Sequence, residues 1–132
     1  MKRIIVIVAS VFILILIGRL FYSILFNNDS TTNIQNIKSD VESGQYDYNK
    51  GAQQMNSRNF PEAEKHFLEV LKYKDHLSKE IYINTLVNLG ICCVNQEKPD
   101  QAKEYWQQAA DLGDKDAANN LKVLNERLKH KI

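Results

Sequence analysis

Apolar residues are distributed along this chain in two different ways. The stretch from Ile4 to Phe26 is almost entirely apolar and holds one charge, Arg19. After it, apolar residues recur at helical spacing among polar and charged ones. As a helix rising about 1.5 Å per residue, the first stretch is about 34 Å long, which is enough to cross a hydrocarbon core of about 30 Å. The pattern therefore predicts two parts that lie in different surroundings.

The first part, residues 1–26, is predicted to be a transmembrane signal-anchor helix. A cleavable signal peptide is an alternative, but no small-x-small cleavage site follows the apolar core. A buried soluble helix is a third possibility, although a helix that is apolar all round needs a larger protein to cover it. The residues assigned to the membrane segment are Ile4, Ile17, Arg19 and Phe26.

The charges that flank this segment predict its orientation. Lys2 and Arg3 precede it, whereas the residues that follow are uncharged or acidic as far as Lys38. Because positive charges favour the cytoplasmic side, we expect a single-pass membrane protein with a cytoplasmic N-terminus. The remaining domain is then expected on the extracytoplasmic side, in the periplasm or at the outer face.

Residues 27–39 are predicted to be a polar linker that becomes helical toward its end, and residues 40–132 a helical domain. Only two prolines and four glycines punctuate the domain, which favours helices over strands. The fold class predicted is therefore all-α. The expected helices cover residues 40–57, 61–74, 78–96, 99–112 and 115–130.

The domain contains an internal repeat with a period of 39 residues. In each unit a small residue lies twelve positions after a glycine, and a large aromatic follows four positions later. A glycine and an alanine at this spacing allow two helices of a pair to approach closely, while the aromatic fills the layer between neighbouring pairs. The equivalent residues are Gly51, Ala63, Phe67 and Val70 in the first unit, and Gly90, Ala102, Trp106 and Ala109 in the second.

This spacing resembles the tetratricopeptide repeat (TPR) family, whose signature includes Leu-Gly followed by Ala-x-x-x-Phe. Leu89-Gly90, Ala102 and Trp106 match it best, whereas Lys50 stands where the first unit should have leucine. The segment from Ala109 to Asp114 is also similar to the related Sel1-like repeats. The resemblance implies a short α-solenoid of two helix pairs, closed by a C-terminal capping helix over residues 114–131.

In the TPR family, the first helices of the repeats line a groove that binds peptides, so the resemblance implies a groove here. Asn49 and Asn88 are equivalent, and each amide could pair with a peptide N–H and C=O together. These asparagines could equally satisfy groups of their own helices. The groove residues implied are Tyr48, Asn49, Ala52, Met55, Asn84, Val87, Asn88, Ile91 and Asn95, flanked by Gln45 and Asn56.

The composition excludes several classes of function and points to no particular chemical activity. The chain has 17 basic and 16 acidic residues and a net charge of +1, which gives no electrostatic basis for nucleic-acid binding. The adjacent cysteines Cys92 and Cys93 form neither a disulfide framework nor a paired metal motif, and burial as small apolar side chains is the expected fate. No nucleophile with a base and no phosphate loop is present, so no enzyme activity, cofactor, metal or small-molecule substrate is expected.

The function predicted from these features is that of a membrane-anchored TPR adaptor or scaffold, which binds a partner protein through its groove. One alternative is a signal-cleaved periplasmic or secreted Sel1/TPR-like binding protein, for example a toxin-neutralising partner. Another is an accessory subunit of a membrane protein complex.

Overall fold

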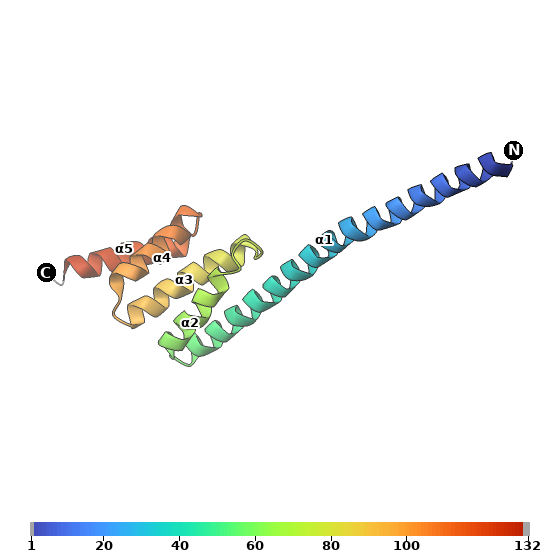
Figure 1. The fold of residues 1–132 in the computed structure, drawn as a ribbon. Helices are drawn as coiled ribbons and strands as arrows, with labels where there is room; N and C mark the ends of the chain where they lie inside the picture. The colour runs from blue at the N-terminus through green and yellow to red at the C-terminus, as the bar shows by residue number, and fades with distance from the viewer. Residues whose placement is uncertain (1, 131–132) are drawn as a thin grey trace. The chain divides into compact units, whose positions relative to one another are not determined.

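The computed structural model describes residues 2–130, and for residues 2–11 and 26–30 it describes the backbone alone. Within this part of the chain the fold is all-α, as the sequence predicts, with five helices and no strand (Figure 1). The helices are α1 (Lys2–Asn56), α2 (Phe60–Leu71), α3 (Lys79–Asn95), α4 (Pro99–Asp111) and α5 (Lys115–Lys129).

The chain divides into two units, Met1–Lys38 and Ser39–Ile132. The stretch over residues 27–39, which we expected to begin as coil, is helical throughout as part of α1. Neither glycine nor proline occurs in this stretch, so nothing in its backbone ends the helix. The polar side chains alone had suggested a linker.

The predicted location in a membrane is contradicted by the structure. Among the residues whose side chains are described, no helix has an apolar stretch long enough to span a bilayer. The described apolar side chains of α1 run from Phe12 to Leu25, interrupted by Arg19, over about 21 Å of helix. A bilayer core is about 30 Å thick. The expected single-pass topology, with a cytoplasmic N-terminus and an extracytoplasmic domain, is therefore not supported.

The structure describes two of the four side chains assigned to the membrane segment. Ile17 is 56% exposed and Arg19 is exposed as well, both in α1. Ile4 and Phe26 lie outside the residues whose side chains are described.

Side-chain caps fix where α3 and α5 begin. The hydroxyl of Ser78 accepts a hydrogen bond from the backbone N–H of Ile81 at 3.2 Å. The carboxylate of Asp114 accepts one from the N–H of Ala117 at 2.7 Å. Each satisfies a donor that the first turn of a helix leaves unpaired. Gly113 precedes the second cap with φ of +100°, a conformation that suits glycine at a helix end.

Within the second unit α3 packs against α2 and α4, and α4 packs against α5. Two clusters of buried side chains result. The lower cluster contains Ala63, Phe67, Leu89 and Cys92. The upper cluster contains Leu86, Cys93, Ala102, Trp106, Ala109, Ala117 and Leu124. Leu71 and Tyr105 are half-buried and pack against both clusters.

The two repeated glycines each lie against the repeated aromatic of the same helix pair. A Cβ at Gly51 in α1 would come within 2.8 Å of the Phe67 ring in α2. A Cβ at Gly90 in α3 would collide with the indole of Trp106 in α4. The aromatic therefore occupies the space beside the glycine within a pair, whereas the sequence had suggested the layer between neighbouring pairs.

Candidate functional site

The predicted groove residues lie on α1 and α3 of the second unit. Tyr48 and Met55 are half-buried and pack against the lower cluster, where the Tyr48 ring meets the Phe67 ring edge-on at 5.9 Å. Val87 and Ile91 pack against the upper cluster. The apolar members of the predicted set are thus divided between the two clusters. Each leaves only part of its side chain to solvent.

The polar members of the set differ in how their amides are used. Asn49 is exposed and its side-chain oxygen accepts a hydrogen bond from Gln45 at 3.3 Å. Asn95 is exposed and donates to the carbonyl of Ile91 at 2.9 Å, within its own helix. The other members of the set are Ala52, Asn84 and Asn88, which are half-buried, and the flanking Asn56 is exposed.

A polar network, which the sequence did not reveal, joins α2 to the turn between α3 and α4. The Glu64 carboxylate accepts hydrogen bonds from Gln96 at 2.6 Å and from Lys98 at 2.9 Å. Its side chain is 13% exposed. Burial raises the pKa of Glu64, but the hydrogen bonds from Lys98 and Gln96 and the charge of Lys98 together hold this pKa below its ordinary value of 4.5.

Both cysteines are fully buried, as the sequence predicts. Burial, with the nearby Cys93 thiol and Glu64, raises the pKa of Cys92 to about 12. Burial, with the charge of Glu64, raises the pKa of Cys93 to about 11. Nucleophilic and metal-binding chemistry needs the thiolate, so these side chains act as packing groups.

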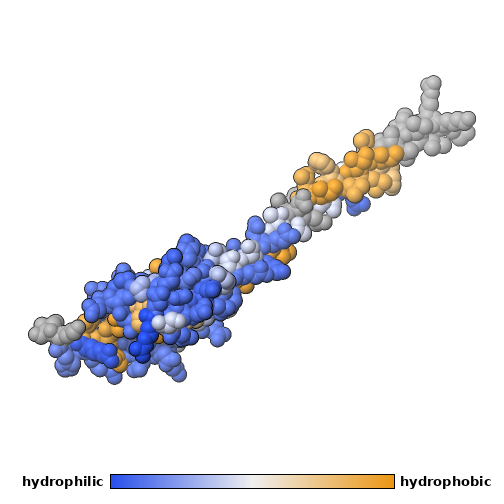
Figure 2. All heavy atoms as spheres, turned by 90° about the horizontal axis from the view of Figure 1, so that it is seen from below, coloured by the Kyte–Doolittle hydropathy of each residue, from blue (hydrophilic) through white to orange (hydrophobic). Residues whose placement is uncertain are grey.

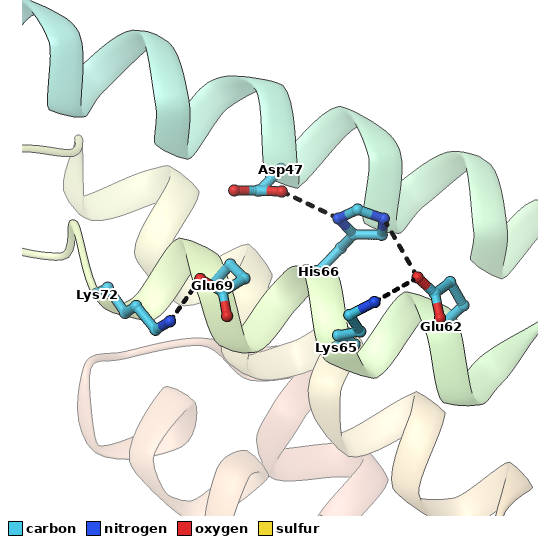
Figure 3. Close-up of polar contacts among 6 residues, drawn as sticks. All are labelled: Asp47, Glu62, Lys65, His66, Glu69 and Lys72. Carbon is cyan, nitrogen blue, oxygen red and sulfur yellow. Dashed lines mark hydrogen bonds and ion pairs between the residues drawn. The ribbon is translucent and has the colours of Figure 1, made fainter.

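Two histidines connect the second unit's part of α1 to the following elements. The Nδ1 atom of His66 lies 3.0 Å from an Asp47 oxygen, and its Nε2 atom lies 3.9 Å from Glu62 (Figure 3). The Nδ1 atom of His76, in the turn after α2, lies 2.8 Å from an Asp40 oxygen. Sequence spacing alone could not pair residues 19 and 36 positions apart.

Surface hollows lie beside α5 and beside the second unit's part of α1. A hollow of about 500 Å³ is lined by Val94, Glu97, Pro99, Leu124, Arg127 and Leu128. Another hollow is lined by residues of α1 between Ser39 and Asp47 and, on its other side, by Tyr73. The face of the second unit seen in Figure 2 is mostly hydrophilic. In the first unit, exposed apolar residues between Phe12 and Leu25 form the hydrophobic band drawn in orange.

Comparison with protein-family models, with curated proteins and with solved structures found no match. Among the residues that the structure describes, no three His, Cys, Asp or Glu side chains gather as a metal site would require. The arrangement offers hydrogen-bonding amides and half-buried apolar side chains on α1 and α3.

Proposed function

We propose that the second unit is a TPR-like tandem of two helix pairs, which binds another protein and has no catalytic role. One observation carries this proposal. The glycine–aromatic contact of Gly51 with Phe67 is repeated by Gly90 with Trp106, one 39-residue period later. Helix pairs that repeat the same contact in series are the unit from which binding solenoids are built.

The turns between paired helices repeat as well, which supports the same proposal. Arg58 and Glu97 both have φ of 59°, in the left-handed region. The N–H of Arg58 donates to Met55 at 2.9 Å, and the N–H of Glu97 donates to Val94 at 3.1 Å. The backbone therefore follows the same path at both turns, although Arg and Glu have opposite charges.

The proposed binding face consists of the outward parts of α1 and α3. Asn49 and Asn88 occupy equivalent positions, two residues before the contacting glycines. An extended segment that crosses both helices would give each amide one backbone N–H and one C=O to pair with. Half-buried Tyr48 and Val87 supply apolar contact beside the amides. Recognition of this kind fixes the direction of the bound segment without a charged anchor.

The test starts from random peptides displayed against the immobilised full-length chain, followed by affinity measurement on the selected peptides. We expect Asn49→Ala and Asn88→Ala each to weaken binding about tenfold, because each removes a bidentate hydrogen-bond pair. Asn119→Ala is the matched control, since Asn119 is an exposed amide on α5. Equal affinity for all three variants, or failure to select any peptide, would contradict the proposal.

A further inference from the structure

A second surface, separate from the face on α1 and α3, lies on α5. Helix α5 repeats the spacing of α3 with an offset of 35 residues. Both helices have two leucines three positions apart, followed at once by a small or short polar residue. The matching residues are Leu86, Leu89 and Gly90 in α3, and Leu121, Leu124 and Asn125 in α5.

Burial agrees with this alignment. Leu89 belongs to the lower cluster, together with Ala63 and Phe67 of α2. Leu124, its counterpart, belongs to the upper cluster, which contains the equivalent α4 residues Ala102 and Trp106. Helix α5 therefore lies against α4 as α3 lies against α2. By this criterion α5 is the first helix of a third pair, rather than the polar cap that the sequence suggested.

The opposite side of α3 is covered by α4. Gly90 receives the Trp106 indole, and the Cys93 thiol lies 3.9 Å from the Gln101 side chain. Leu86 is fully buried in the same cluster. The counterparts of these three residues on α5 are Leu121, Asn125 and Leu128, which we call the α5 seam.

No helix of the described chain covers the α5 seam. Leu128 lines the hollow of about 500 Å³ described above, and the seam residues line two further open hollows. Leu121 and Asn125 line a hollow of about 560 Å³ against α4. Asn125 and Leu128 line one of about 340 Å³. In Figure 1, α5 ends the row of helices in the second unit. The seam on α5 thus corresponds to the face of α3 that α4 covers, but no helix of the described chain covers it.

The charges around the seam specify what would cover it. In the preceding pair Glu64 accepts a hydrogen bond from Lys98, the N-cap residue just before the covering helix α4. Lys103 takes the place of Glu64 one period later, so the charge at this position is positive instead of negative. Lys103 lines both hollows, with Glu104 in the larger and Lys129 in the smaller. The smaller hollow is therefore lined by two lysines, whose positive charge favours a carboxylate in the covering segment.

We propose that the α5 seam binds an amphipathic helix of another protein, with a carboxylate at its N-terminal end between Lys103 and Lys129. Its apolar residues cover Leu121 and Leu128. A small residue lies over Asn125, because the Asn125 side chain fills the space that Gly90 leaves for an aromatic.

A second copy of this chain fits the seam poorly. The helix that covers the equivalent face is α4, which is preceded by the N-cap residue Lys98 and carries Trp106. The lysine would repel Lys103, and the indole would collide with Asn125. The α4 of a second copy is also already packed between its own α3 and α5.

The experiment uses two synthetic peptides with the sequence of residues 97–112, both carrying Trp106→Ala. One also carries Lys98→Glu, and the other keeps the lysine as the matched control. Fluorescence anisotropy measures their affinity for the full-length chain. We expect the acidic peptide to bind about tenfold more tightly, because its carboxylate meets two lysines beside a partly desolvated seam.

Replacement in the chain gives the decisive comparison. Lys103→Glu should reverse the preference, so that the peptide with the lysine binds more tightly. Lys115→Glu is the control, because Lys115 is an exposed lysine of α5 outside the seam. Circular dichroism verifies that each variant keeps the helical content of the parent. Asn49→Ala leaves both affinities unchanged if the seam is independent of the face on α1 and α3.

Three results would overturn the proposal. The first is that neither peptide binds, and the second is that both bind equally to the parent and to the Lys103→Glu chain. The third is concentration-dependent dimerisation in sedimentation analysis that Leu128→Asp abolishes, which would assign the seam to a second copy.

Discussion

At the scale of single residues, Gly90 shows how closely the helix pairs are fitted. The indole of Trp106 lies where a Cβ would stand, and its Nε1 atom donates a hydrogen bond to the carbonyl of Val87 at 3.0 Å. The ring is therefore held at both its face and its polar edge. Phe67 occupies the equivalent position beside Gly51, but its side chain has no hydrogen-bond donor. The aromatic ring is therefore held more firmly in the α3–α4 pair than in the α1–α2 pair.

Replacing Gly90 with alanine should lower the free energy of unfolding by about 1–3 kcal/mol, because the added methyl displaces a fixed indole. Gly51→Ala should cost less, since the Phe67 ring has no hydrogen bond to lose. Gly18→Ala is the control, because its Cβ would meet open space. Urea unfolding monitored by Trp106 fluorescence measures all three. An unchanged midpoint for Gly90→Ala would contradict this packing.

The thiols make a second prediction at this scale. Burial, with the other causes named above, raises the pKa of Cys92 to about 12 and that of Cys93 to about 11. At about pH 8 both groups are therefore thiols, which react slowly. We expect an aromatic disulfide reagent to label neither cysteine in the native chain and both in urea. Rapid labelling of the native chain would show that the core is open.

At the scale of elements, Glu64 ties α2 to the turn that begins α4. Because hydrogen bonds and the Lys98 charge hold its pKa below 4.5, the carboxylate stabilises the fold above about pH 4.5. This contribution is lost as the pH falls through the folded pKa, where the carboxylate becomes protonated.

The unfolding free energy of Glu64→Gln should therefore be lower than that of the parent at neutral pH, and the difference should shrink below about pH 4.5. Urea titrations at a series of pH values measure the difference. Glu104→Gln serves as the control, since Glu104 is exposed on α4. A difference that grows on acidification would have the wrong sign for a lowered pKa.

The elements also show what the sequence could predict. Ser78, Asp114, Pro99 and Gly113 mark helix ends through local chemistry, and the structure begins or ends helices within a few residues of them. The 39-residue spacing likewise identified Phe67 and Trp106 as core side chains, which are 0% and 5% exposed.

Other features depend on contacts that sequence does not encode locally. The pairing of Glu64 with Gln96 and Lys98 spans more than 30 positions and arises only when α2 meets the α3–α4 turn. The sequence did not predict the seam on α5, because the polar residues of this helix suggested a capping surface. That the seam lacks a covering helix is seen only when the packing of α5 is compared with that of α3.

At the scale of the whole molecule, the two clusters share Leu71 and Tyr105, so the second unit should unfold as one cooperative body. A Cys93→Ala chain leaves Cys92 as a thiol probe of the lower cluster, while Trp106 reports on the upper one. We expect labelling and fluorescence to give the same urea midpoint. Labelling of Cys92 at clearly lower urea would show that the pairs unfold separately.

The proposed function requires the outward parts of α1 and α3 to form one binding face for an extended protein segment. The decisive experiment is hydrogen–deuterium exchange of the full-length chain, with and without a peptide selected against it. We expect the bound peptide to add protection in residues 45–56 and 84–95 together. Protection confined to α4 and α5, or to only one of the two predicted ranges, would contradict it.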